Sequence, residues 1–176
     1  DAVATLEETA KAGVDTPWCR RMGALACDEL GLVAGANGRA EEAESWLRRA
    51  VDASGKTVPD LAKTRFVEYR EARAVARLEL GSLLLAQSRV DEAAPEIDAA
   101  LEMAERIEAE LPDVTTHPHL LARAKSAKAQ LQAARGDRDG ATTLAAEALA
   151  LASRAVELAP DHAEYRAQRE RLLTAR

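Results

Sequence analysis

The chain has 176 residues and a formal net charge of −6; aromatic residues make up only 3% of it, whereas alanine makes up roughly a quarter. This length is enough for one well-cored domain. An acidic chain without a long basic run argues against nucleic-acid binding, and no apolar stretch approaches the ~20 residues that span a membrane. Alanine favours helices that pack closely, so the composition predicts an all-α fold.

The first predicted elements in chain order are a short, partial amphipathic helix over residues 1–12 and a helix pair over about residues 18–54. Pro17 suits the first turn of that pair, because the N–H that proline lacks has no helical partner there. Asn37-Gly38 is a turn dipeptide and divides the pair into two helices.

Two further helix pairs and a final helix complete the predicted chain. The pairs cover about residues 61–111 and 117–158, and Pro112 and Pro160 end their second helices because proline cannot continue a helix. The final helix, residues 161–175, is rich in Arg, Glu and Gln, which is typical of the polar cap at the end of a repeat array. The prediction is therefore about eight helices in a single domain.

Small residues recur at offsets of seven, five and seven in all three pairs. The three sets are Gly31, Gly38, Ala43 and Ala50; Gly81, Ser88, Ala93 and Ala100; and Ala129, Gly136, Ala141 and Ala148. Small residues at fixed offsets indicate helices that cross closely. The copies lie 50 and then 48 residues apart, which indicates a solenoid rather than a globular bundle.

These residues resemble tetratricopeptide repeats. The third copy is the weakest match, and the best matches are Leu30, Gly31, Gly38, Ala43, Leu47 and Ala50 in the first copy and Leu80, Gly81, Leu84, Ala93, Ile97 and Ala100 in the second. The usual unit has ~34 residues, so each helix here is about two turns longer, similar to the repeats of kinesin light chains and bacterial signalling proteins. The resemblance implies a right-handed superhelical solenoid of antiparallel helix pairs that acts as a protein-interaction scaffold.

In this family the first helix of each pair lines a concave groove. By position, the resemblance places the following residues there: Leu25, Asp28, Leu32, Val75, Leu78, Ser82, Leu85, Arg123, Ser126 and Gln130. An apolar centre that becomes polar at one end suits an amphipathic helix or an extended peptide. Alternatively, Leu25, Val75 and Leu85 simply contact neighbouring helices because these helices are long. Two peptide grips known in the family, a Lys/Asn/Arg carboxylate clamp and a backbone-holding Asn pair, are absent at these positions.

The densest basic and aromatic stretch is a second candidate surface, suited to docking an acidic partner. It comprises Arg65, Phe66, Tyr69, Arg70, Arg73 and Arg77. The alternative is a solvated helix face on which these arginines pair with carboxylates of the same helix, namely Glu68, Glu71 and Glu79.

Residues of the kinds that perform catalysis or bind metals are few. A weak metal site at His117-Pro118-His119 is the less favoured interpretation, and a polar loop with proline at the first helical position is the favoured one. No phosphate-binding loop or hydrolase motif occurs, so we expect no enzyme, cofactor or metal. Cys19 and Cys27 are too far apart along one helix for a disulfide, which favours a reducing compartment.

We therefore expect a protein–protein interaction module that binds a partner peptide or helix in its groove. The chain begins at Asp1 without a signal-peptide pattern, and we expect it to be part of a larger bacterial protein in the cytoplasm. The alternatives are a sensory or regulatory domain that binds a small peptide, and a self-association domain that forms homo-oligomers.

Overall fold

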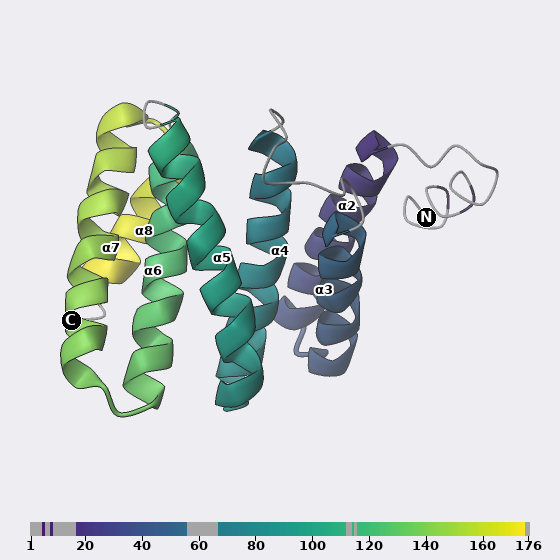
Figure 1. Ribbon diagram of the computed structural model, residues 1–176, viewed down its shortest axis with the longest axis horizontal. Coiled ribbons are helices and arrows are strands. Elements are labelled where there is room, and N and C mark those ends of the chain that lie inside the picture. Colours follow the sequence, from purple (N-terminus) through teal and green to yellow (C-terminus); the bar gives the residue numbers. More distant parts are fainter. Residues whose placement is uncertain are drawn as a thin grey trace.

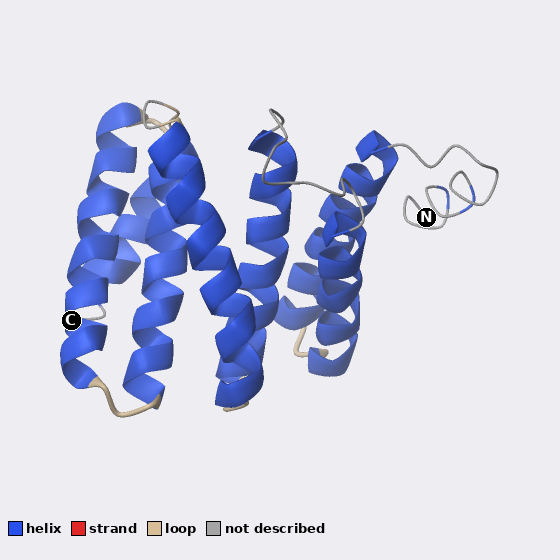
Figure 2. Ribbon diagram, viewed as in Figure 1, coloured by secondary structure: helices blue, strands red, loops and turns tan. Residues whose placement is uncertain are grey.

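The computed structural model describes Thr5, Glu8 and residues 17–55, 67–111, 114 and 116–174. Within these residues the protein is all-α, with seven helices and no strand (Figures 1 and 2). The predicted helix over 1–12 falls outside the described residues, apart from two of its positions. The predicted start of the second pair, residues 61–66, also falls outside them.

The described helices follow the predicted order closely. Their bounds are α2 (Pro17–Ala36), α3 (Ala40–Gly55), α4 (Val67–Ala86), α5 (Val90–Glu110), α6 (Thr116–Ala134), α7 (Arg138–Leu158) and α8 (Ala163–Thr174). The predicted pairs 18–54 and 117–158 differ from these bounds by at most one residue. None of these helices is apolar over a length sufficient to cross a bilayer.

The three hairpin turns share one backbone conformation. The second residue after each first helix has a positive φ, which is 72° at Gly38, 62° at Ser88 and 85° at Gly136. In each turn the next N–H donates to a carbonyl five residues back, at 2.9 Å from Arg39 to Ala34, 2.9 Å from Arg89 to Leu84 and 3.0 Å from Asp137 to Gln132. This is the Schellman arrangement, which favours glycine at the residue with positive φ. The turns therefore repeat at the spacing that the small residues predicted.

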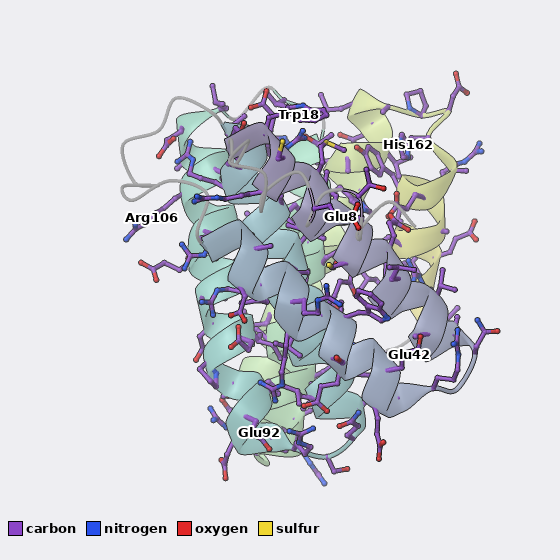
Figure 3. All side chains as sticks on the ribbon, turned by 90° about the vertical axis from the view of Figure 1, so that its right-hand side faces the viewer. Glu8, Trp18, Glu42, Glu92, Arg106 and His162 are labelled. Atoms are coloured by element: carbon purple, nitrogen blue, oxygen red, sulfur yellow. The ribbon has the colours of Figure 1, made fainter. Side chains whose placement is uncertain are left out.

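Each helix contacts the next one along the chain, and α4 also contacts α2 and α6. Figure 1 shows α2 and α3 at one end, α4 and α5 in the middle, and α6, α7 and α8 at the other end. Charged side chains of the second helices extend outward, among them Glu42, Glu92 and Arg106 (Figure 3).

The predicted close crossings occur where the sequence has glycine. A Cβ atom added at Gly31 would lie 2.7 Å from Leu47 Cγ, and one added at Gly81 would lie 2.7 Å from Ile97 Cγ1. Each glycine therefore leaves room for a large side chain sixteen residues later. The third copy has alanine at both equivalent positions, so it replaces a small–large pair by two small residues.

A single apolar cluster runs through α4, α5 and α6. Leu78, Leu84, Ile97, Ile107 and Leu131 are at most 2% exposed within it. Ala100 and Ala104 separate the larger side chains and are also buried, which lets these helices approach closely. This core fixes the spacing of α4 and α6, and the two helices carry most of the predicted groove.

Candidate functional site

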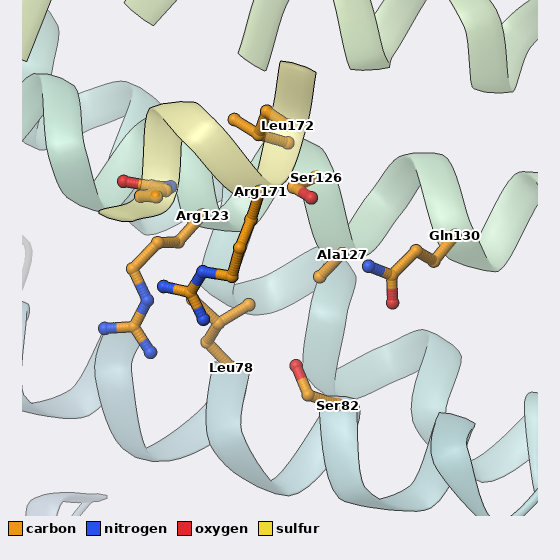
Figure 4. A pocket seen from close by; sticks show the side chains of 9 residues that line it. Leu78, Ser82, Arg123, Ser126, Ala127, Gln130, Arg171 and Leu172 are labelled. Atoms are coloured by element: carbon orange, nitrogen blue, oxygen red, sulfur yellow. The ribbon is translucent and has the colours of Figure 1, made fainter. Parts of the chain in front are cut away.

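A cavity of about 290 Å³ lies between α4, α6 and α8 (Figure 4). Its lining comes from three helices and comprises Leu78 and Ser82 of α4, Arg123, Ser126, Ala127 and Gln130 of α6, and Gln168, Arg171 and Leu172 of α8. Five of these side chains belong to the ten residues that the resemblance placed in a groove. We call this space the α4–α6–α8 cavity.

A second cavity, of about 310 Å³, adjoins the first and shares Arg123 with it. Its lining is richer in titratable groups and comprises Glu71, Val75, Thr116, His119, Leu120, Arg123, His162, Glu164 and Tyr165. Val75 is a further predicted groove residue at this surface. The two cavities therefore form neighbouring recesses along α6, with Arg123 between them.

Four predicted groove residues line neither of these cavities. Leu25 and Leu85 are half-buried, Leu32 is exposed, and Asp28 is buried. The alternative interpretation holds for Val75 and Leu85, which pack against the apolar core, and Leu78 belongs to the core itself. Leu78 therefore contributes to the fold as well as to the cavity wall.

Asp28 lies in a row of charged groups that crosses three helices. Its carboxyl group is only 6% exposed, and Oδ1 has no hydrogen-bond partner. Burial, together with the neighbouring carboxylate of Glu79, raises the pKa of Asp28 to about 7, while the guanidinium of Arg123 opposes the rise. Arg123 itself forms an ion pair with Glu79. Arg123 of α6 therefore interacts with carboxyl groups of both α2 and α4.

Sequence reasoning missed the contribution of α8. Gln168 is 5% exposed and its Oε1 has no hydrogen-bond partner, although the residue lines the α4–α6–α8 cavity. The available signal was the spacing of Tyr165, Gln168 and Leu172, which places all three on one face of a helix. That spacing indicates that the final helix has one face directed toward the rest of the fold, in addition to its predicted role as a polar cap.

The predicted basic and aromatic surface is largely occupied by contacts within the fold. Arg70 is mostly buried and forms two hydrogen bonds with Glu110, at 2.8 and 2.5 Å. Arg77 binds Glu96 at 2.6 Å. The expected partners on the same helix are therefore wrong for these two arginines, because the carboxylates of α5 face them across the hairpin.

Tyr69 and Arg73, the other described members of that surface, are only partly accessible. Burial, with the nearby charge of Arg77, lowers the pKa of Arg73. Tyr69 lies beneath the guanidinium of Arg21 at 5.9 Å. Arg65 and Phe66 are outside the described residues.

The interpretation of residues 117–119 as a polar loop is wrong. Helix α6 begins at Thr116, and His117 and His119 are buried in its first turn. His117 lies 2.9 Å from the carbonyl of Leu111 through Nδ1 and 3.0 Å from Glu71 through Nε2. The loop interpretation failed because these polar rings face α4 and α8 rather than solvent.

His119 packs beneath the start of α8. Its ring stacks on Tyr165 with centroids 4.4 Å apart, and Tyr165 stacks on His162 at 3.9 Å. Burial lowers the pKa of His119, although Glu164, 3.3 Å away, opposes this. In the described part of the chain, no three His, Cys, Asp or Glu side chains are grouped so as to hold a metal.

Comparisons with known proteins give no relative for this chain: no family model, curated protein or solved structure matches it. Function is therefore inferred from the repeat pattern and from the two cavities beside α6.

Proposed function

We propose that the chain is a tetratricopeptide-like solenoid of lengthened repeats that binds a segment of a partner protein along α4, α6 and α8. The observation that carries this proposal is the α4–α6–α8 cavity, whose wall includes equivalent residues of two copies. Leu78 corresponds to Ser126, and Ser82 corresponds to Gln130, each pair 48 residues apart. Binding surfaces of solenoids arise in this way, from the same position in successive repeats.

The mechanism is passive binding on a preformed surface. The buried core of α4, α5 and α6 holds the cavity wall before a partner arrives, so most of the ordering cost falls on the partner segment. An amphipathic helix or an extended peptide has suitable dimensions for neighbouring recesses along one helix. Membership of a larger bacterial protein in the cytoplasm stays a prediction.

Blocking the cavity tests this function. Peptides would first be selected from a displayed random library on the wild-type chain, and the affinity of each would be measured by fluorescence anisotropy. Ser82→Tyr adds a ring at the cavity wall, at a position that is only partly buried, and should weaken binding at least tenfold. Leu78 is less suitable because its burial would make most substitutions destabilising.

Ser45→Tyr is the matched control, since Ser45 is exposed on α3 and lines neither cavity. It should bind the selected peptides like the wild type. Equal binding by Ser82→Tyr and Ser45→Tyr, or failure to enrich any peptide, would contradict the proposed function.

A second candidate, self-association, is favoured by exposed apolar side chains on α2. Trp18 is 59% exposed, Val33 is 51% exposed and Leu32 is 41% exposed. Apolar groups of this size at one end of an array suit contact with a second copy. Light scattering over a range of concentrations would detect such a contact, and Val33→Glu should abolish any rise in mass.

A further inference from the structure

The α4–α6–α8 cavity contains a guanidinium group without a carboxylate partner in the part of the chain that the structure describes. Arg171 extends from α8 toward Leu78 and lies between Arg123 and Ser126 in Figure 4. None of the ion pairs within the described residues includes Arg171. Arg123 is different, because its charge is already engaged by Glu79. In a chain of net charge −6, Arg171 is thus a cation at a cavity without a counter-ion among the described residues.

The same cavity contains an acceptor that lacks a donor. Gln168 is 95% buried (5% exposed), lines the cavity, and has no partner for its Oε1. A buried carbonyl oxygen without a donor is unfavourable. The oxygen is itself buried in the unliganded chain, so accepting a ligand N–H requires the Gln168 side chain to rotate toward the cavity that it lines. The hydroxyl groups of Ser82 and Ser126, which line the same cavity, can donate to an anion or accept from an N–H.

These groups together define the ligand chemistry. We propose that the α4–α6–α8 cavity binds the side-chain carboxylate of an Asp or Glu residue within a partner peptide, with Arg171 as its counter-ion and Gln168 as acceptor for the peptide N–H. An acidic residue in a peptide presents both features, a carboxylate and a nearby amide. This inference rests on the proposed function, because it assumes that the ligand is a protein segment.

The second cavity favours an internal acidic residue over a chain terminus. It begins on the other side of Arg123, so a peptide chain can continue past the carboxylate along α6. A terminal carboxylate would leave that second recess empty.

Nuclear magnetic resonance on the full chain tests the proposal with single-residue probes. The main probe is N-acetyl-L-glutamate N-methylamide, which has the side-chain carboxylate and both peptide groups. We expect saturable shifts at Ser82, Ser126, Gln168 and Arg171. The uncharged probe N-acetyl-L-glutamine N-methylamide should bind at least tenfold more weakly, because charge-assisted hydrogen bonds are the stronger ones.

Two variants of α8 locate the binding group. Arg171→Gln should weaken binding of the glutamate probe at least tenfold without changing the thermal unfolding midpoint, since Arg171 is exposed and has no carboxylate partner among the described residues. Arg166→Gln is the matched control on the same helix, because Arg166 is exposed and lines neither cavity. It should bind like the wild type.

Several results would overturn the proposal. Equal binding of the glutamine probe would show that the charge of the carboxylate is not recognised. Unchanged binding by Arg171→Gln would show that Arg171 is not the counter-ion of the carboxylate. Tighter binding of N-acetylglycine than of the glutamate probe would indicate a chain terminus instead. If Ser82→Tyr abolishes binding of display-selected peptides while the glutamate probe does not bind, the proposed function stands and this subsite is rejected.

Discussion

Asp28 is the residue at which charge and burial conflict most clearly. Its carboxyl group lies on α2 beside Glu79 of α4, and only Arg123 of α6 opposes the raised pKa. The resemblance to tetratricopeptide repeats placed this residue in the groove, but the charged groups with the largest effect on its pKa, Glu79 and Arg123, lie on other helices. The position of Asp28 along its own helix therefore carried no information about the protonation state of its carboxyl group.

We expect Asp28→Asn to stabilise the protein at neutral and higher pH. The raised pKa means that the folded state holds this proton more tightly than the unfolded chain, so stability falls as the pH rises from about 4, the unfolded value, to about 7. Asparagine keeps the shape of the neutral acid and cannot ionise. Its advantage over wild type should grow through this window by about 1.4 kcal/mol per unit of pKa shift and then level off.

Urea unfolding at intervals from pH 4 to pH 8.5 would measure this difference. Asp52→Asn is a suitable control, because Asp52 is exposed on α3, and its stability should follow the wild type at each pH. A constant difference between Asp28→Asn and wild type over the whole range would show that Asp28 does not titrate as the structure indicates.

At the scale of the helix, close crossings and turns account for the repeat. Gly31 and Gly81 occupy crossings in which a methyl group would meet a large side chain. The equivalent turn residues are Gly38, Ser88 and Gly136, and all have positive φ. Both features were visible in the sequence because they depend on spacing within one hairpin.

Gly81→Ala should lower the free energy of unfolding by about 1–3 kcal/mol, the usual cost of overpacking. The new Cβ would lie 2.7 Å from Ile97 Cγ1 and 3.2 Å from the backbone nitrogen of Ile97, which cannot move aside easily. Gly23→Ala is the matched control, since a Cβ added there on α2 would have no atom of another described element within 4 Å. It should raise stability by about 0.5–1 kcal/mol through helix propensity, and equal effects of the two changes in thermal unfolding would contradict the close crossing.

Ser88→Gly should stabilise the second hairpin by about 0.5–1 kcal/mol. Serine at a φ of 62° bears the steric cost of the left-handed conformation, whereas glycine does not. The reciprocal change Gly136→Ser should destabilise the third hairpin by a similar amount, because its φ is 85°. Chemical denaturation of both variants would measure the effects, and effects of the same sign would contradict a shared turn conformation.

At the scale of the whole molecule, ion pairs and stacking join elements that are distant in sequence. Glu79–Arg123 links α4 to α6, and Glu108–Arg154 links α5 to α7. Such partly exposed pairs contribute about 0–1 kcal/mol each, so cohesion comes mainly from the core of α4, α5 and α6. Helix α8 is outside that core and is held by Tyr165 and Gln168.

We expect α8 to open locally in mildly acidic solution. Burial lowers the pKa of His119, and the facing charges are Glu164, which opposes the shift, and Arg123 and His162, which support it. Once α8 is detached, His119 is hydrated and binds a proton more readily. The docked state therefore loses stability as the pH falls below about 6.5, the unperturbed histidine value.

Hydrogen exchange, corrected for its intrinsic pH dependence, would detect this opening. Amides of α8 should lose protection between pH 7.5 and pH 5.5 while those of α4 and α5 keep it, as expected for a local opening. His119→Gln should remove most of the pH dependence of α8 protection. His162→Gln, at an exposed position, should leave much of this pH dependence in place. Uniform loss of protection in all helices would instead indicate global unfolding.

The sequence by itself determined the helices, their turns and the close crossings, because each depends on spacing within one helix or one hairpin. The resemblance to tetratricopeptide repeats placed Ser82 and Gln130 on a common surface. Only the tertiary structure decided that α8 folds over that surface with Gln168 and Arg171, and that Arg70 and Arg77 turn to α5. These contacts depend on how helices cross, which sets the facing side chains and is not encoded in the spacing of any one helix.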